Sequence, residues 1–207
     1  ALYIGNEQKI SSLTLAYGLR YSYYSYYGPG DKYEFGIPLS SGDRRPLISE
    51  NKVGKSESIQ NYSSLEPRVS LNVLLGNTSS LKASYNRMTQ YIHLLSNTAA
   101  SSSLDVWTPS TNNIKPEIAD AYVLGYFKNF KNNTYEASLE LYYKDLENQI
   151  DYINGADLLI NKYIEGDLLT GIGRAYGLEF LFKKNRGRYS GWFSYTLGRS
   201  ELKIDGI

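Results

Sequence analysis

Few residues in this sequence carry groups that usually perform chemistry in proteins. The 207 residues include one histidine, His93, and no cysteine. Thiolate chemistry is therefore not expected, nor is a zinc or haem site built from paired His and Cys ligands. Acidic residues are frequent, but they lack the regular Asp, Asn and Gly spacing of a calcium-binding loop. Because no nucleophile is visibly paired with a base either, we expect no catalytic residue, no bound metal and no cofactor.

Four residues have side chains suited to contact a ligand, namely Arg87, Tyr91, His93 and Trp107. The first three are close in sequence, and Trp107 follows in a polar connection rich in Ser, Asn and Thr. We expect them near the mouth of a ligand-binding site. For His93 the alternative is an ordinary polar residue at the junction of a strand and a loop.

The elements that must position these side chains show a regular alternation. From Leu13 to Tyr23 the odd positions hold Leu or Tyr, and the even positions hold small, polar or charged residues such as Arg20. Successive side chains of a β-strand point to opposite faces, so this stretch has one apolar face and one polar face. It is longer than the usual soluble strand and matches the roughly ten residues with which a barrel strand crosses a bilayer.

The same alternation predicts seven strands, joined by connections that are alternately long and short. The strands are expected at about Lys9–Tyr27, Tyr62–Leu75, Ser80–Ile92, Ala119–Phe130 and Thr134–Leu146, then around Tyr176–Phe182 and Phe193–Gly198. The long connections are Gly28–Asn61, His93–Ile118 and Glu147–Gly173, and the short turns are Gly76–Thr78, Lys131–Asn133 and Asn185–Gly187. This asymmetry is typical of an all-β, antiparallel up-and-down transmembrane β-barrel with short periplasmic turns and long external loops. The first, third, fifth and seventh strands are then expected to run outward.

Charged residues occupy several polar positions of these strands, namely Arg20, Arg68, Glu136, Glu140, Lys144 and Glu179. We expect them to face the barrel interior and to pair across neighbouring strands rather than to act as acids or bases. Tyrosines cluster at the outer end of the first strand, at Tyr23, Tyr24, Tyr26 and Tyr27. They are interpreted as an aromatic girdle, with a stacking platform for sugars as the alternative.

Seven strands are not expected to close a barrel, because single-chain bacterial barrels have even strand numbers. Leu2–Ile4, followed by a predicted turn at Gly5-Asn6-Glu7, has the pattern of the end of a further strand. We therefore interpret residues 1–207 as one partial β-barrel domain, with the remaining strands absent.

Composition limits the other classes of protein. The net charge of +1 gives no reason to expect nucleic acid as a partner. The unbroken apolar runs are far shorter than the roughly eighteen residues of a transmembrane helix. A soluble, Tyr-rich carbohydrate-binding β-domain stays an alternative, because the 21 tyrosines suit a sugar-binding face. Long strands, long loops and tyrosine hydroxyls that would need buried partners disfavour it.

Four segments carry motifs in a specific order. They are Ile114–Glu117 followed by Tyr122–Tyr126, Tyr142–Asp145 followed by Asn148–Ile150, Gly173–Glu179, and Gly191–Thr196. Together they resemble the barrel of a TonB-dependent outer-membrane receptor of the type abundant in Bacteroidetes. Val123 departs from the glutamate that this family usually has at that position.

The resemblance implies a parent barrel of about 22 strands, filled by an N-terminal plug that is absent from residues 1–207, and located in the cell outer membrane. Such a receptor imports a bulky nutrient, for example a siderophore, a glycan or a peptide. The implied partners are the outer-membrane lipid bilayer, TonB through the plug segment and the unidentified nutrient, with a surface lipoprotein as a further candidate. The alternatives are a non-transporting barrel subunit or scaffold of an envelope complex, the soluble carbohydrate-binding domain and, remotely, an outer-membrane hydrolase.

Overall fold

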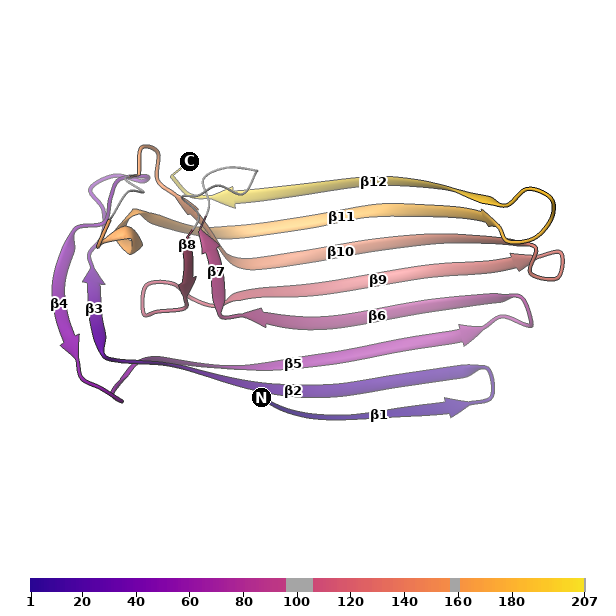
Figure 1. Ribbon diagram of the computed structural model, residues 1–207, viewed down its shortest axis with the longest axis horizontal. Coiled ribbons are helices and arrows are strands. Elements are labelled where there is room, and N and C mark those ends of the chain that lie inside the picture. Colours follow the sequence, from indigo (N-terminus) through magenta and orange to yellow (C-terminus); the bar gives the residue numbers. More distant parts are fainter. Residues whose placement is uncertain (96–105, 157–160, 207) are drawn as a thin grey trace.

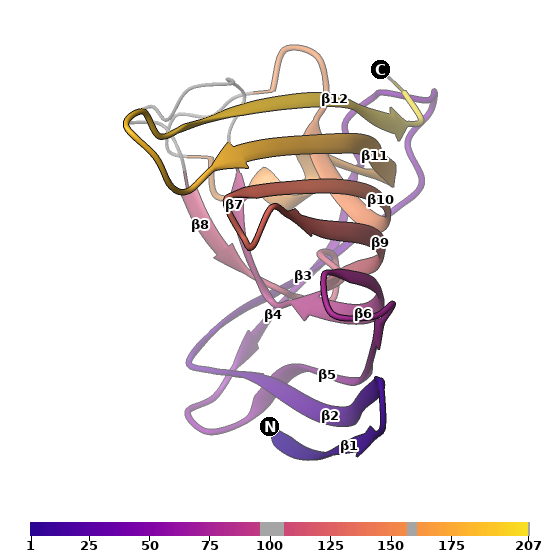
Figure 2. The same ribbon diagram turned by 90° about the vertical axis from the view of Figure 1, so that its right-hand side faces the viewer.

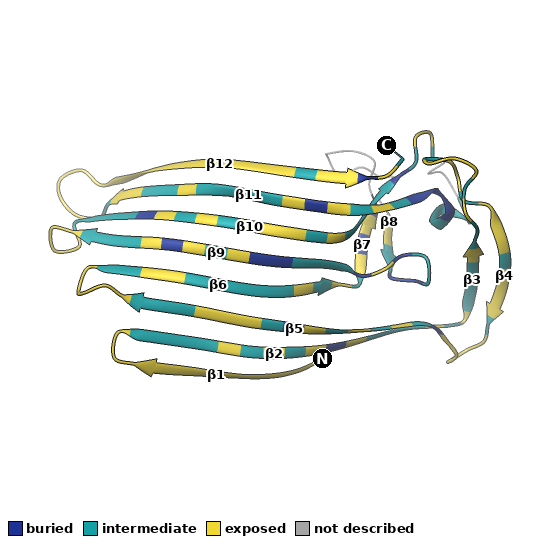
Figure 3. Cartoon of the chain, turned by 180° about the vertical axis from the view of Figure 1, so that it is seen from behind, coloured by how far each residue is buried: buried dark blue, intermediate teal, exposed yellow. Residues whose placement is uncertain are grey.

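The computed structural model describes residues 1–95, 106–156 and 161–206, and within them eight long strands form one antiparallel sheet (Figure 1). The strands are β1 (Leu2–Ile10), β2 (Leu13–Tyr27), β5 (Ser58–Leu74), β6 (Ser79–Gln90), β9 (Glu117–Phe130), β10 (Tyr135–Tyr152), β11 (Leu168–Lys184) and β12 (Gly191–Ile204). Their order in the sheet follows their order in the chain, so the topology is up-and-down. β1 and β12 are the edges, and Figure 3 shows both exposed along most of their length.

The connections between long strands are short at one end of the sheet and long at the other (Figure 1). The long ones contain β3 (Gly30–Phe35) paired with β4 (Leu47–Val53), β7 (Ile92–Leu95) paired with β8 (Val106–Pro109), and the 3-10 helix η1 (Ile164–Asp167). The predicted alternation of long and short connections is therefore confirmed. Residues 96–105 and 157–160, which belong to two of the predicted long connections, lie outside the described residues.

The predicted first strand was wrong at its beginning. The chain turns at Ser11, which has a φ of 54°, and this turn separates β1 from β2. Gly5-Asn6-Glu7, predicted as a turn, lies inside β1, where Gly5 pairs with Gly18 of β2. Both glycines make room for the ring of Tyr3, since a Cβ added at Gly18 would lie 2.5 Å from the Tyr3 hydroxyl. The described sheet therefore has eight strands rather than the predicted seven.

The third long connection is shorter than predicted, because β10 continues to Tyr152 and β11 begins at Leu168. A β-bulge explains the difference. The register shifts between Glu147 and Gln149, and Asn148 adopts a φ of 56°. A bulge adds one residue to a strand without ending its pairing, so the two-residue alternation stops while the strand goes on.

Alternation gives the sheet two chemically different faces. One row runs across seven strands with residues directly opposite each other: Leu15, Leu71, Ala83, Leu124, Leu141, Leu178 and Leu197. We call the face that carries this row the apolar face, and the opposite one, which carries Ser22 and Glu66, the polar face. Leu124 is 44% exposed and Leu141 is 46% exposed. A continuous apolar face of this extent is unfavourable in water and indicates a surface that meets another apolar phase.

Viewed from its short turns, the sheet is strongly twisted and curved, and β7 and β8 lie on its concave side (Figure 2). A small apolar core at the loop end joins Leu95, Ile114, Tyr152 and Leu168. In the part of the chain that the structure describes, no helix is long and apolar enough to span a membrane.

Candidate functional site

The three long connections contact one another at one end of the sheet and form what we call the loop cap, residues 28–57, 91–95, 106–116, 153–156 and 161–167. Its first and third connections are joined through two arginines. Arg44 forms an ion pair with Asp167 at 2.9 Å, and Asp167 is buried. The backbone amide of Arg45 donates to the carbonyl of Gly166 at 3.0 Å. Partial burial lowers the pKa of Arg45. The Arg45 guanidinium also lies 5.4 Å from the centre of the Phe35 ring.

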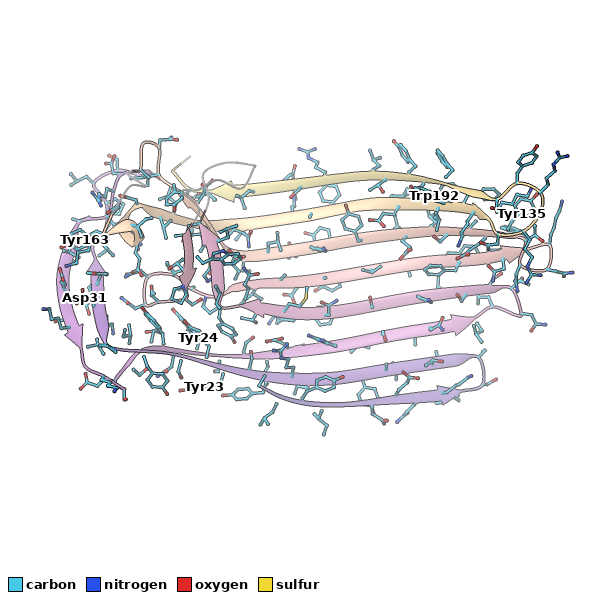
Figure 4. The ribbon with its side chains drawn as sticks, in the orientation of Figure 1. Tyr23, Tyr24, Asp31, Tyr135, Tyr163 and Trp192 are labelled. Atoms are coloured by element: carbon cyan, nitrogen blue, oxygen red, sulfur yellow. The ribbon has the colours of Figure 1, made fainter. Side chains whose placement is uncertain are left out.

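A second contact between the same connections joins Glu50 on β4 to Lys162 and Tyr163. The Lys162 ammonium lies 2.6 Å from the Glu50 carboxylate, and the Tyr163 hydroxyl donates to it at 3.1 Å. The hydrogen bond from Lys162 holds the pKa of Glu50 below its ordinary range, and the same bond raises the pKa of Lys162. Tyr163 also packs edge-on against Tyr33 at a centroid distance of 5.4 Å, and Figure 4 shows Tyr163 close to β3.

The second connection completes the loop cap. The side-chain amides of Asn112 and Asn113 both donate to the carbonyl oxygen of Tyr33, at 2.7 and 2.9 Å. Asn113 also donates to the carboxylate of Glu165 at 2.5 Å. Each connection therefore hydrogen-bonds to the other two, and the cap is one assembled surface rather than three independent loops.

Tyr91, one of the residues predicted to bind ligand, connects the loop cap to the polar face of the sheet. Its ring stacks on that of Tyr24 at 5.0 Å with an interplanar angle of 4°. Its hydroxyl shares a hydrogen bond of 2.7 Å with Ser22, which donates to the buried carboxylate of Glu66 at 2.7 Å. Arg20 lies 3.9 Å from Glu66, so its predicted pairing across neighbouring strands is confirmed.

His93 is buried inside the junction between β7 and the sheet, with 1% of its surface exposed. Its Nε2 atom lies 2.8 Å from the hydroxyl of Ser110, and its Nδ1 atom lies 3.4 Å from the carboxylate of Glu117. Ser110 is also completely buried. These contacts fasten the β7–β8 hairpin to the start of β9, and they leave neither His93 nor Ser110 open to solvent.

The other two predicted residues are elsewhere. Arg87 lies on the apolar face, where its guanidinium binds both carboxylate oxygens of Asp120 at 2.9 and 2.5 Å. Trp107, on β8, is 67% exposed. The structure thus brings Tyr91 and His93 to the base of the loop cap, places Trp107 on the surface of the cap and separates Arg87 from all three. A role in ligand binding stays a prediction for each of them.

Two grooves on the polar face were not identified from the sequence, and the second of them lies beside the base of the loop cap. The first, of about 620 Å³, is lined by Tyr3, Glu7, Gly18, Arg68 and Asn86 among others. The second, of about 500 Å³, is lined by Arg20, Glu66, Arg68, Gln90, Glu117 and Gln149 among others. Arg68 belongs to both. The register of β2 against β5 places Arg68 between the two grooves, and this register cannot be read from the sequence.

On the apolar face a row of tyrosines crosses four neighbouring strands: Tyr85, Tyr122, Tyr143 and Tyr176. Successive ring centroids are 5.0, 6.4 and 6.4 Å apart. We call this set the tyrosine row. The predicted girdle of four tyrosines at the end of β2 was wrong in part, because Tyr24 stacks on Tyr91 on the polar face.

The next row toward the loop cap is charged and runs through Arg87, Asp120, Asp145, Arg174 and Glu201. We call it the charged row. The hydroxyl of Tyr85 donates to Asp120 at 2.8 Å, and that of Tyr143 donates to Asp145 at 3.0 Å. Tyrosines with apolar rings on one side and hydrogen-bonded hydroxyls on the other are typical of the boundary between lipid and water.

A curved antiparallel sheet with an apolar outer face, a tyrosine row and long connections at one end only is a part of a transmembrane β-barrel wall. Comparison with known families specifies which kind. Residues 1–205 match the family described as TonB dependent receptor-like, beta-barrel, and the chain belongs to that family. The family predicted from the sequence motifs and the all-β fold are both confirmed.

Among solved structures, the chain is similar to the FrpB iron transporter from Neisseria meningitidis (F3-3 variant), with a TM-score of 0.62 and 13% sequence identity. The match covers 98% of this chain and 25% of that transporter, so the chain spans about a quarter of its length. At this identity the likeness concerns the fold. A search of curated proteins finds no match.

Proposed function

We propose that this chain supplies part of the wall and of the ligand-binding loops of a TonB-dependent transporter, which imports a bulky nutrient across the outer membrane. The observation that carries the proposal is the loop cap. Three connections are joined by hydrogen bonds and ion pairs at one end of the sheet. One face of the sheet is polar and carries two grooves, and the other face is apolar. Family membership supports the same function.

The proposed orientation follows from the connections. The short turns face the periplasm, and the loop cap faces outward, as in other outer-membrane barrels. In this orientation the tyrosine row lies at the outer edge of the lipid region and the charged row lies among the headgroups. The polar face with its two grooves is the lumen side, along which cargo passes.

The proposal includes TonB and a plug as partners, because the family uses both, and it leaves the class of nutrient open. The FrpB protein is named as an iron transporter, so iron chelates are among the nutrients to be tested. No bond-breaking chemistry is part of the proposal. Ser110, the hydroxyl that lies beside His93, is buried and does not reach a cargo.

Growth of a strain that lacks the full-length gene tests this function. The strain is compared with a complemented strain and a TonB-deficient strain on iron chelates, vitamins, glycans and peptides. We expect one nutrient class whose use is lost in both the deletion strain and the TonB-deficient strain. Growth defects that appear without TonB dependence would indicate a passive pore. A weakened envelope without any nutrient defect would indicate a scaffold, and either result contradicts the proposal.

A further inference from the structure

Arg68 occupies the point on the polar face where the two grooves meet. It lines both the groove of about 620 Å³ and the groove of about 500 Å³. In the sheet it stands opposite Gly18 of β2 and Asn86 of β6, so neither of its direct neighbours is charged. Its side chain is exposed, and within the described residues it takes part in no ion pair.

The two carboxylates of the second groove already have partners. Glu66 is only 2% exposed, accepts a hydrogen bond from Ser22 and lies 3.9 Å from Arg20. Glu117 faces the imidazole of His93 at 3.4 Å. In the first groove the carboxylate is that of Glu7, on the edge strand β1, with β2 lying between it and the strand of Arg68. The positive charge of Arg68 is thus left available to a bound molecule.

Neutral hydrogen-bond donors line the first groove together with Arg68. The Tyr3 ring lies over Gly18, the residue directly across from Arg68, and its hydroxyl occupies the space that a side chain at Gly18 would need. The amide of Asn86 stands on the other side, on β6. Guanidinium, phenol and amide groups in one groove suit an acceptor with several oxygens, and a guanidinium binds carboxylate or phosphate through two parallel hydrogen bonds.

We propose that Arg68, with Tyr3 and Asn86, forms a subsite for a carboxylate or phosphate group of the imported cargo. Arg68 also lines the second groove, which reaches Glu117 and hence the base of β7, so this groove connects the subsite to the loop cap, where cargo enters. This inference rests on the proposed function and narrows it to cargo that carries an anionic group. A carboxylate supplied by another part of the same protein offers the same chemistry and has to be separated by experiment.

Calorimetric titration of the purified full-length protein in detergent with citrate, inorganic phosphate and acetate tests the subsite. The variants are Arg68→Gln, Arg68→Lys and, as a matched control, Lys183→Gln, an exposed cation on the polar face of β11 that lines neither groove. We expect wild-type protein to bind at least citrate. We also expect a loss of about tenfold in affinity for Arg68→Gln, a smaller loss for Arg68→Lys and no change for the control.

Two results would overturn the subsite. One is that no anion binds to the wild-type protein at concentrations up to about 50 mM, at which even a very weak site would be occupied. The other is that anions bind to Arg68→Gln as tightly as to the wild type. If this variant also melts at a lower temperature than the control, Arg68 belongs to an ion pair within the protein. Failure of the subsite is distinguishable from failure of the proposed function, because TonB-dependent growth would persist if only the subsite were wrong.

Discussion

Gly177 on the polar face of β11 illustrates how tightly single residues pack in this sheet. A Cβ at this position would lie 2.6 Å from the backbone oxygen of Leu197 and 2.7 Å from the hydroxyl of Tyr142. Because a backbone atom has to move, we expect Gly177→Ala to lower the free energy of unfolding by about 1–3 kcal/mol. Urea titration of the full-length protein, followed by heat-modifiable gel migration, measures this. Gly191→Ala is the control, since nothing lies within 4 Å of its added methyl group, and equal losses in both variants would contradict the packing.

Two of the four predicted ligand residues, Arg87 and His93, show which side-chain positions the sequence could and could not predict. Arg87 shares the apolar side of its strand with Leu81, Ala83 and Tyr85, so its place on the apolar face was readable from the alternation alone. The burial of His93 was not readable. It depends on Ser110, which the pairing of β8 with β7 brings next to His93. A two-residue alternation does not encode this pairing.

The loop cap is the element whose stability depends most directly on pH. The pKa of Glu50 is lowered by the hydrogen bond from Lys162, so this contact stabilises the cap above the ordinary glutamate pKa and is lost as the pH falls through the lowered value. The pKa of Lys162 is raised, so its contribution is complete below the ordinary lysine pKa and is lost only as the pH rises through the raised value. The contact should therefore be complete from about pH 5 to about pH 9.

Proteolysis of full-length protein in detergent measures this dependence, with acid-tolerant and neutral proteases directed at residues 36–46. We expect faster cleavage at about pH 3 than at about pH 7 in the wild type, and fast cleavage at both in Lys162→Gln. Lys55→Gln, in the exposed turn after β4, serves as the control and should follow the wild type. A cap that is equally resistant at both pH values would contradict a role for this ion pair.

Strand pairing was predictable where each strand alternates and ends in a turn, as β5, β6 and β9 do. It failed at the two places where local geometry changes without a change in residue class. Gly5 had the sequence of a turn but lies in β1 to make room for Tyr3. Asn148 continues β10 through a bulge, which moves the following side chains to the other phase of the alternation.

At the scale of the whole molecule, the apolar face and the alternating connections were enough to predict a membrane barrel. Lateral register was not predictable, because it depends on how each strand pairs with two neighbours at once. Register is what aligns the tyrosine row beside the charged row and what places Arg68 across from Gly18. The proposed boundary of the membrane and the grooves of the polar face therefore follow only from the assembled sheet.

The central claim is that the apolar face meets lipid while the polar face lines the lumen. Spin labels at single introduced cysteines on β10 test it most directly, in full-length protein reconstituted into bilayers with native cysteines replaced. At Leu141→Cys, in the apolar row, we expect high accessibility to oxygen and low accessibility to a water-soluble nickel chelate. At Asp145→Cys, in the charged row, and at Lys144→Cys, on the polar face, we expect the chelate to gain access. A label at residue 141 that the chelate reaches as readily as at residue 144 would contradict the claim.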